Sequence, residues 1–312
     1  MTDRAAQLQI TSYKESHHQL SEAQHGYGRH HSCETALHVV TDNILGAMDR
    51  GEIALWAMVG LPKCFDMVPH DKLLEKLCLY GIDTFWIKDY LEGHTQQVQL
   101  TNSALGSVSR SSIKENSVGV YQGGSLSCVL WCIFANDLCL HVPDSVRIVQ
   151  FADDTKIWTS GKRRDLPVLV SRIETALQCL FDWFCNHGTK VNAAKTEFIV
   201  FGSRQLLALT SDVSVKFNDS TIRAAKEVPN IGVIFYRNLS FQSHVSLIVQ
   251  KCTGMLLALN NAKHGLPRNT IKHLIDALMT SAMRYCLSVV FGVCGQMEKR
   301  RLQKLLTSPR EC

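Results

Sequence analysis

The sequence predicts an α+β fold followed by a basic segment that is entirely helical, and three observations support this prediction. First, the 312 residues are 46% hydrophobic and 20% charged, which is typical of a globular chain with a large core. Second, short apolar runs typical of strands are interspersed with longer stretches that carry apolar residues at helical intervals. Third, only the helical pattern remains from Phe241 onward.

Hydrophobic periodicity places the elements in order along the chain. In the first four fifths, apolar residues at helical spacing predict helices at 5–20, 34–50, 71–81, 122–140 and 169–184. Short apolar or alternating runs predict strands at 53–59, 146–158 (as a hairpin), 197–201 and 213–217. Two further helices are expected at 245–259 and 271–285, with a loop at 260–268. We expect the boundary of the helical segment between Ile234 and Ser240.

The net charge of +5 is unevenly distributed. From Lys251 to the end, ten Lys and Arg residues face three Asp and Glu residues, a balance of +7 that leaves −2 for the rest. Basic helices often have only a solvated face, but an asymmetry of this size also fits contact with a polyanion.

Nothing in the chain indicates secretion or a membrane partner. The longest apolar stretch, 126–135, is shorter than the roughly 20 residues that span a bilayer, and the N-terminus lacks an apolar signal region. We therefore expect an intracellular location, in the nucleus or cytoplasm. The twelve cysteines include no Cys-x-x-Cys pair, so most are expected to be free.

The most informative local feature is the pair Asp153 and Asp154 at the turn of the predicted hairpin. Adjacent carboxylates repel each other unless a cation or water stabilises them, so a divalent metal site is one interpretation. An exposed turn is the other, because Asp is common in turns. A second feature is the turn at Gln122, Gly123 and Gly124, whose backbone could approach a phosphate or base closely.

Six segments share one order with a known family. They are QHGYGRHHSCETAL, LPKCFDMVPHDKLLEKL, GVYQGGSLSCVLWCIFANDL, FADDTKIW, WFCNHGTKVNAAKTEFIVFGS and PNIGVIFYRNLSFQSHV. On these segments the chain resembles the reverse transcriptases of non-LTR (LINE-type) retrotransposons from about Gln24 to Arg310. The resemblance implies a right-hand polymerase with partial fingers at 1–50, a palm with inserted fingers elements at 51–239, and a basic helical thumb at 240–312.

The resemblance also implies an activity, RNA-directed DNA synthesis. Such a nucleotidyltransferase uses two Mg²⁺ ions, or Mn²⁺ in their place, with an RNA template, a DNA primer and deoxynucleoside triphosphates. Asp153 and Asp154 would be the catalytic metal ligands, and Lys195 would donate a proton near the pyrophosphate.

The resemblance assigns binding roles as well. Gln122 and Gly123 would line the nucleotide pocket. Phe65 would exclude the ribose 2′-hydroxyl, although an ordinary core aromatic is the alternative. Apart from the resemblance, we expect the charge of the C-terminal segment to place four basic residues in contact with phosphates, unless they only decorate a solvated helix end: Lys299, Arg300, Arg301 and Lys304.

One departure puts the activity in doubt. Where the family has a metal-binding Asp, five residues before Phe65, this chain has Gly60. Asp66 is not an obvious replacement, because it lies beyond Pro62, and it has a simple interpretation as a helix cap. We therefore expect impaired synthesis that Gly60→Asp raises. The alternatives are a catalytically inactive nucleic-acid-binding remnant and, with less support, a maturase-like RNA-binding factor.

Overall fold

The structure is a computed structural model that describes residues 2–61, 63–102, 106–189, 191–210, 212–262 and 265–307. The chain divides into two compact units whose segments alternate along the sequence. Unit 1 contains residues 1–31, 58–157 and 174–196, and unit 2 contains residues 32–57, 158–173 and 197–312. The fold is mixed α and β, as the periodicity predicts.

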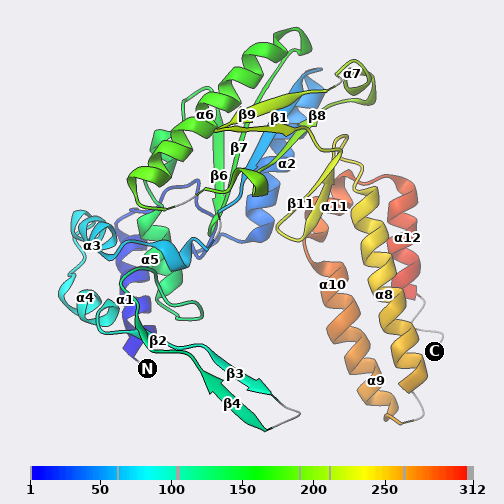
Figure 1. Cartoon of the computed structure of the whole chain (residues 1–312). Helices are drawn as coiled ribbons and strands as arrows, with labels where there is room; N and C mark the ends of the chain where they lie inside the picture. The colour runs from blue at the N-terminus through cyan, green and yellow to red at the C-terminus, as the bar shows by residue number, and fades with distance from the viewer. Residues whose placement is uncertain are drawn as a thin grey trace. The chain divides into compact units, whose positions relative to one another are not determined.

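A four-stranded sheet has the strand order β6-β7-β1-β8 (Figure 1). Its strands are β1 (Ile53–Val59), β6 (Arg147–Phe151), β7 (Asp154–Gly161) and β8 (Glu197–Phe201). Residues 53–57 of β1 are all fully buried, which explains why its sequence is continuously apolar instead of alternating. The Trp56 ring packs 5.5 Å from Phe201 and 5.4 Å from Phe235. The predicted strands at 53–59 and 197–201 are confirmed.

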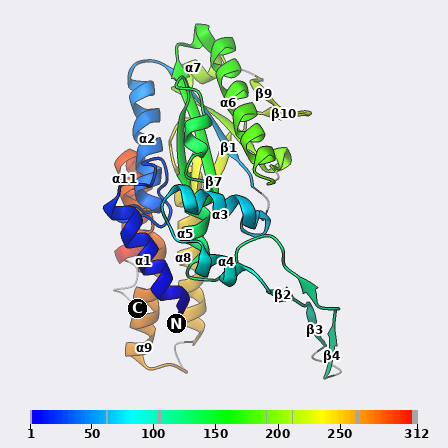
Figure 2. The same cartoon turned by 90° about the vertical axis from the view of Figure 1, so that its left-hand side faces the viewer.

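Unit 1 contains four helices besides α6, one of which, α5, is almost completely buried. They are α1 (Thr2–Ser16), α3 (His70–Leu79), α4 (Phe85–Leu91) and α5 (Ser127–Phe134). Both α1 and α3 contact α5, of which seven of the eight residues are buried (Figure 2). The helix predicted from residue 122 begins only at Ser127, because Gly123 has a positive φ of 88° within a turn.

Two small hairpins of unit 1 were not predicted from the sequence. Strand β2 (Thr95–Gln96) pairs with β5 (Lys114–Glu115), and β3 (Gln99–Asn102) pairs with β4 (Ser107–Arg110). The β3–β4 hairpin projects away from α4 in Figures 1 and 2. Its apolar side chains are exposed, 68% for Leu100. Because they do not pack into a core, the hairpin lacks the alternation of buried and exposed residues from which a strand is predicted.

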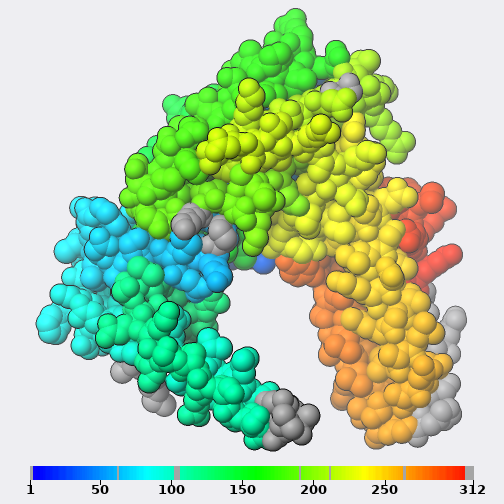
Figure 3. All heavy atoms as spheres, in the orientation of Figure 1, coloured from blue at the N-terminus to red at the C-terminus, as the bar shows by residue number. Residues whose placement is uncertain are grey.

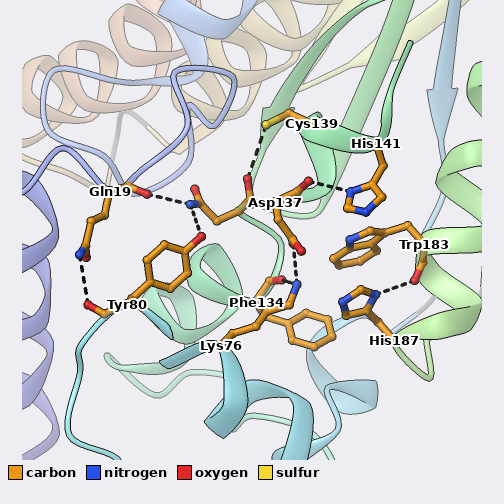
Figure 4. Close-up of polar contacts among 10 residues, drawn as sticks. Gln19, Lys76, Tyr80, Phe134, Asp137, Cys139, His141, Trp183 and His187 are labelled. Atoms are coloured by element: carbon orange, nitrogen blue, oxygen red, sulfur yellow. Dashed lines mark hydrogen bonds and ion pairs between the residues drawn. The ribbon is translucent and has the colours of Figure 1, made fainter. Parts of the chain in front are cut away.

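The long helix α6 (Leu166–Asn186) buries the predicted apolar stripe. Its last turns, which belong to unit 1, cover the buried ammonium group of Lys76 (Figure 4). The Lys76 ammonium lies 2.5 Å from an Asp137 carboxylate oxygen and 2.6 Å from the Phe134 carbonyl. It also lies 4.6 Å from the centre of the Trp183 ring, which stacks on His187 at 3.9 Å. Ion pairing, hydrogen bonding and a cation–π contact together compensate for burying this charge.

Unit 2 contains two small β hairpins and most of the remaining helices. Two hairpins, β9 (Ser214–Phe217) with β10 (Ser220–Arg223) and β11 (Glu227–Asn230) with β12 (Val233–Tyr236), are antiparallel. The helices are α2 (Cys33–Asp49), α7 (Arg204–Ala208), α8 (Gln242–Ala262), α9 (Arg268–Ile275), α10 (Ser281–Arg284), α11 (Leu287–Val293) and α12 (Gln296–Thr307). A capping box of Ser32 and Thr35 begins α2. Helices α8 and α9 lie side by side (Figure 3).

The apolar stripe predicted for 271–285 is wrong in its second half. A π turn at Asp276–Thr280 follows α9 and adds a residue to one turn. This insertion rotates the following residues, so Met279 and Met283 are buried. Leu278 and Tyr285, which would continue the apolar stripe of Ile271, Leu274 and Ile275 in a regular helix, are 44% and 41% exposed. Regular periodicity cannot anticipate such a shift.

Within the described ranges, no single helix is both long and apolar enough to cross a bilayer. A bent pair, Arg268–Arg284 with Leu287–Val293, passes by length and composition only, with a bend of 59°.

Candidate active site

The turn that carries the two aspartates is held by side chains from elsewhere in unit 1. Strand β6 ends at Phe151 and β7 begins at Asp154, so Ala152 and Asp153 form a two-residue turn. Ala152 has a positive φ of 53°, which is strained for a residue with a Cβ. Its carbonyl accepts hydrogen bonds from Gln24 Nε2 at 3.2 Å and Trp131 Nε1 at 3.0 Å, and its N–H donates to Gln24 Oε1 at 3.0 Å.

The segment that contains Gln24 is tied to the edge of β6 by its backbone. The Gln150 N–H donates to the Ala23 carbonyl at 2.7 Å, and the His25 N–H donates to the Gln150 carbonyl at 2.8 Å. Gln24 therefore has a fixed position, and its buried amide can hold the turn in one conformation. The three hydrogen bonds that Ala152 makes with Gln24 and Trp131 compensate for the strain of its positive φ.

Asp153 lies among neutral donors. It accepts a hydrogen bond from the buried Cys64 thiol, and burial together with the Asp153 charge raises the pKa of this thiol far above its usual range. Burial and a hydrogen bond to Cys128 likewise raise the pKa of Tyr27, near the same carboxylate. Both groups therefore stay protonated at neutral pH, and neither adds a negative charge beside Asp153.

Asp154 faces solvent, with 59% of its side chain exposed. Its carboxylate lies 3.9 Å from the Lys156 ammonium, whose side chain is only 2% exposed. Partial desolvation raises the pKa of Asp154, and the Lys156 charge opposes that shift. The buried His25 is neutral at pH 7, because burial first, and then the charges of His31 and Lys156, lower its pKa to about 4.

Gly60 lies where the sequence lacks the expected third carboxylate, and the backbone near Lys195 fills the adjacent space. The Asn192 N–H donates to the Gly60 carbonyl at 3.2 Å, and the Gly60 N–H donates to Thr196 Oγ1 at 3.4 Å. A Cβ on Gly60 would lie 2.6 Å from the Lys195 carbonyl oxygen and 2.8 Å from its carbonyl carbon. An Asp at this position therefore requires the backbone of residues 192–196 to move.

Asp66 forms a contact that was not predicted. Instead of capping a helix, it lies in a 3-10 turn (Phe65–Met67), and its Oδ1 accepts a 2.8 Å hydrogen bond from Gln122 Nε2. The half-buried Phe65 ring lies 5.5 Å from Trp131, so part of it faces outward. Three of the residues assigned to the nucleotide pocket by resemblance thus belong to one neighbourhood: Phe65, Gln122 and Gly123.

The carboxylates present do not form a complete two-metal cage. Among the described residues there is no group of three His, Cys, Asp or Glu side chains that could hold a metal ion. Within the same ranges no hydrogen bond or ion pair joins the exposed Lys195 to Asp153 or Asp154. Two carboxylates alone are a poor match to the near-octahedral oxygen ligation of Mg²⁺.

The predicted phosphate-binding residues of α12 divide into two kinds. Arg301 donates a 3.0 Å hydrogen bond to Ser246 of α8, and the Lys299 ammonium lies 5.0 Å from the centre of the Phe291 ring. These two side chains therefore support packing within unit 2. Arg300 and Lys304 are exposed.

Comparison with known proteins decides the family. The profile of the family described as "Reverse transcriptase (RNA-dependent DNA polymerase)" matches residues 1–235. The chain belongs to the reverse transcriptase family. This match includes the aspartate turn, the segment around Gln24, and Gly60.

Relatives of this reverse transcriptase are polymerases of mobile elements. The RNA-directed DNA polymerase from mobile element jockey of Drosophila melanogaster is 29% identical over 73% of this chain and 24% of its own length. Its Drosophila funebris counterpart is 23% identical over 98% of this chain and 33% of its own length. The probable polymerase from transposon BS of Drosophila melanogaster is 25% identical over 75% and 26%. The reverse transcriptase domain is of the non-LTR type, and the chain spans a quarter to a third of these relatives.

Among solved structures, this reverse transcriptase is similar to telomerases at low scores. Telomerase from Candida albicans, in complex with a fragment of telomeric RNA, has a TM-score of 0.40 and 14% identity over 96% of this chain and 47% of that one. Apo telomerase from Candida tropicalis has a TM-score of 0.42 and 14% identity over 98% and 52%.

Sequence reasoning did not identify three residues that shape the site. Gln24 and Trp131 position the aspartate turn, and Cys64 donates to Asp153. Gln24 and Cys64 do lie in segments that carry the family resemblance, and this was the available signal. Their roles depend on contacts across about 90 to 130 residues of chain, which no local pattern encodes.

Proposed function

We propose that this chain is a non-LTR reverse transcriptase domain that binds an RNA template and a DNA primer but has impaired nucleotidyl transfer. The observation that carries the proposal is the combination of a well-held aspartate turn and a glycine at position 60. Buried hydrogen bonds hold the turn that carries the two aspartates, whereas the atoms beside Gly60 leave no room for a side chain that would supply a third carboxylate.

The proposed roles are those that the family resemblance implies. Asp153 is the principal acid of the turn, and Asp154 is its exposed neighbour. Phe65, Gln122 and Gly123 are the proposed contacts for the incoming deoxynucleoside triphosphate, with Phe65 beside the ribose. The exposed Lys195 is the proposed proton donor to pyrophosphate.

A bound Mg²⁺ or Mn²⁺ would supply charge neutralisation at the transferred phosphate. The residues of this chain fit such ions only in part, because Asp153 and Asp154 are the only carboxylates of the turn and the position at Gly60 has none. The protein's own contribution is then to hold strand ends and nucleotide in place.

We also propose the three-part division of the polymerase hand: partial fingers at 1–50, palm at 51–239 and basic thumb at 240–312. The four-stranded sheet with the aspartate turn lies within the proposed palm, and the helices α8 to α12 form the proposed thumb. Exposed Arg300 and Lys304 are the proposed thumb contacts for phosphate, because solvent-exposed cations can reach a polyanion.

The test combines two measurements on the same purified chain. Filter binding of a primer–template duplex measures the nucleic-acid interaction, and primer extension with Mg²⁺ and with Mn²⁺ measures synthesis. The proposal expects salt-sensitive binding with extension close to background. Robust extension abolished by Asp66→Ala would contradict the incomplete site, since Asp66 would then be the missing ligand. Absence of binding at low salt would contradict the proposed partner.

A second function, a catalytically inactive nucleic-acid-binding protein, is favoured by the same glycine. The two differ in one result. Extension above background that is lost in Asp153→Ala identifies an impaired polymerase, whereas wild-type extension at background, with binding retained, identifies an inactive remnant.

A further inference from the structure

Unit 2 contains a basic cavity that none of the proposed catalytic residues line. Its volume is about 570 Å³, within the range of sites for small ligands. The lining residues come from α7, from the β11–β12 hairpin with its following loop, and from the start of α8. They include three cations and one aromatic ring: Arg204, Lys226, Arg237 and Tyr236.

The three cations are available to an anion. No described carboxylate lies within 4 Å of the charged atoms of Arg204, Lys226 or Arg237, and no carboxylate lines the cavity. Arg204 and Lys226 are exposed, and Arg237 is half-buried. The Arg237 Nη2 donates to the Leu207 carbonyl at 2.9 Å, which fixes the guanidinium and leaves its other N–H groups for a ligand.

One acid near the cavity offsets part of this charge. Glu227 follows Lys226 in the chain, and its carboxylate accepts a 2.6 Å hydrogen bond from Ser243, a lining residue. The three lining cations outnumber this carboxylate, so the described lining of the cavity is positive. Its other lining groups add neutral donors, with the amides of Asn238 and Gln242 and the hydroxyl of Ser240 among them.

Tyr236 indicates which class of anion fits. A free phosphate ion needs only charge and hydrogen bonds, but an aromatic ring beside cations also offers a stacking surface for a base. Guanidinium groups pair with phosphate oxygens in a bidentate manner. We propose that this cavity binds a phosphate and its adjoining base in a single nucleic-acid strand. The inference rests on the proposed nucleic-acid partner but not on polymerisation.

The first test uses the full chain and a single-stranded RNA of about 12 nucleotides, a length typical of strand-binding sites. Affinity is measured across a salt series for the wild type and for Arg204→Gln/Lys226→Gln. Loss of two phosphate contacts is expected to reduce the slope of log affinity against log salt by about 1.4, at about 0.7 per contact. The matched control is Arg172→Gln/Arg223→Gln, which removes two exposed arginines of unit 2 that do not line the cavity.

The second test locates the ligand directly. Acetylation of Lys226 is followed by mass spectrometry with the RNA, with a DNA strand of the same sequence, and with inorganic phosphate. Protection by either strand is expected, and the two strand arms show whether RNA or DNA is preferred. Equal protection by inorganic phosphate at the same phosphate concentration would overturn the strand assignment.

The outcomes separate this inference from the proposed function. If the wild type binds RNA but Arg204→Gln/Lys226→Gln and its control double variant lower the salt dependence of binding equally, the cavity is not a site, whereas the proposed function stands. If the wild type binds neither RNA nor DNA, both proposals fail. If binding depends on the cavity in a chain without extension activity, the inference holds by itself.

Discussion

The side-chain amide of Gln24 forms hydrogen bonds with both backbone polar groups of Ala152, accepting from its N–H at 3.0 Å and donating to its carbonyl at 3.2 Å. The two residues are 128 positions apart in the chain. Because Ala152 has a positive φ and immediately precedes Asp153, this pairing determines where the carboxylate of the turn points. The aspartate turn is therefore part of a buried hydrogen-bond network and not a loose loop.

The first prediction tests that network. Gln24→Leu leaves the N–H groups of Ala152 and Gly26 without their acceptor, and each unsatisfied buried donor costs about 1–3 kcal/mol. The free energy of unfolding, measured in urea, is expected to fall by about 3 kcal/mol. The control Gln178→Leu removes an exposed hydrogen bond to Asp182 and is expected to change stability by less than about 0.5 kcal/mol. Equal losses of unfolding free energy in both variants would contradict the proposed role of Gln24 in holding Ala152.

The second prediction concerns Gly60. Both Gly60→Ala and Gly60→Asp are expected to lower the free energy of unfolding by about 1–3 kcal/mol, because the new Cβ meets backbone atoms of Lys195 that cannot rotate away. Gly254→Ala, in the middle of α8 with no atom within 4 Å of its Cβ, is expected to stabilise the chain by about 0.5–1 kcal/mol.

The same geometry changes the expectation for catalysis. Restored synthesis was expected for Gly60→Asp from the sequence, but the clash predicts that this single change leaves primer extension at the wild-type level. Extension that rises in Gly60→Asp and not in Gly60→Ala would show that residues 192–196 do move aside.

The third prediction concerns Phe65. If its half-buried ring lies beside the ribose, Phe65→Ala is expected to reduce discrimination against ribonucleotides by about tenfold or more, because removing bulk admits the 2′-hydroxyl. The readout is the ratio of deoxynucleotide to ribonucleotide incorporation with Mn²⁺, or of their binding if extension is absent. Phe65→Tyr keeps the ring and is expected to preserve the ratio. An unchanged ratio in Phe65→Ala would instead favour a core aromatic.

The fourth prediction follows from a buried lysine. Lys14 is 3% exposed, and burial lowers its pKa from 10.5 to about 8. The unfolded chain therefore binds this proton more tightly than the folded one, which costs about 3 kcal/mol below pH 8 at 1.36 kcal/mol per pKa unit. Lys14→Met is expected to stabilise the chain by up to about 3 kcal/mol at pH 7.

The pH dependence makes the Lys14 prediction specific. Since the penalty fades as pH rises from about 8 to 10.5, the gain in Lys14→Met should shrink over that interval. Urea unfolding of both proteins at pH 7, 9 and 10.5 checks this. A gain that stays constant with pH would indicate better packing instead of a removed charge.

The fifth prediction concerns the buried pair in Figure 4. Asp137→Ala leaves the Lys76 ammonium buried with only the Phe134 carbonyl and two aromatic rings as partners, and breaking such a pair costs about 3–5 kcal/mol. Lys76→Met is expected to cost less, because Asp137 is 30% exposed and can be hydrated. The double variant should be more stable than Asp137→Ala. Additive losses, measured by a double-mutant cycle, would refute this coupling.

Local patterns determined much of the secondary structure. The continuous apolar run of β1, the stripe of α6 and the turn between β6 and β7 depend on neighbouring residues, so their periodicity is visible in the sequence. The ordered segments also identified the family, which the profile match confirms. Gly60 was recognised from sequence as a departure at the expected metal position.

The tertiary structure alone decided how the site is assembled. Three sets of contacts join different segments of the chain. They are the hydrogen bonds of Gln24 and Trp131 to Ala152, the hydrogen bond between Asp66 and Gln122, and the approach of Lys195 to Gly60. The π turn before α10 likewise has no local signal, and it places Met279 instead of Leu278 in the buried position. Periodicity reports which face of an element is apolar, but the partner of each polar group and the room beside each Cβ are set by packing between distant segments.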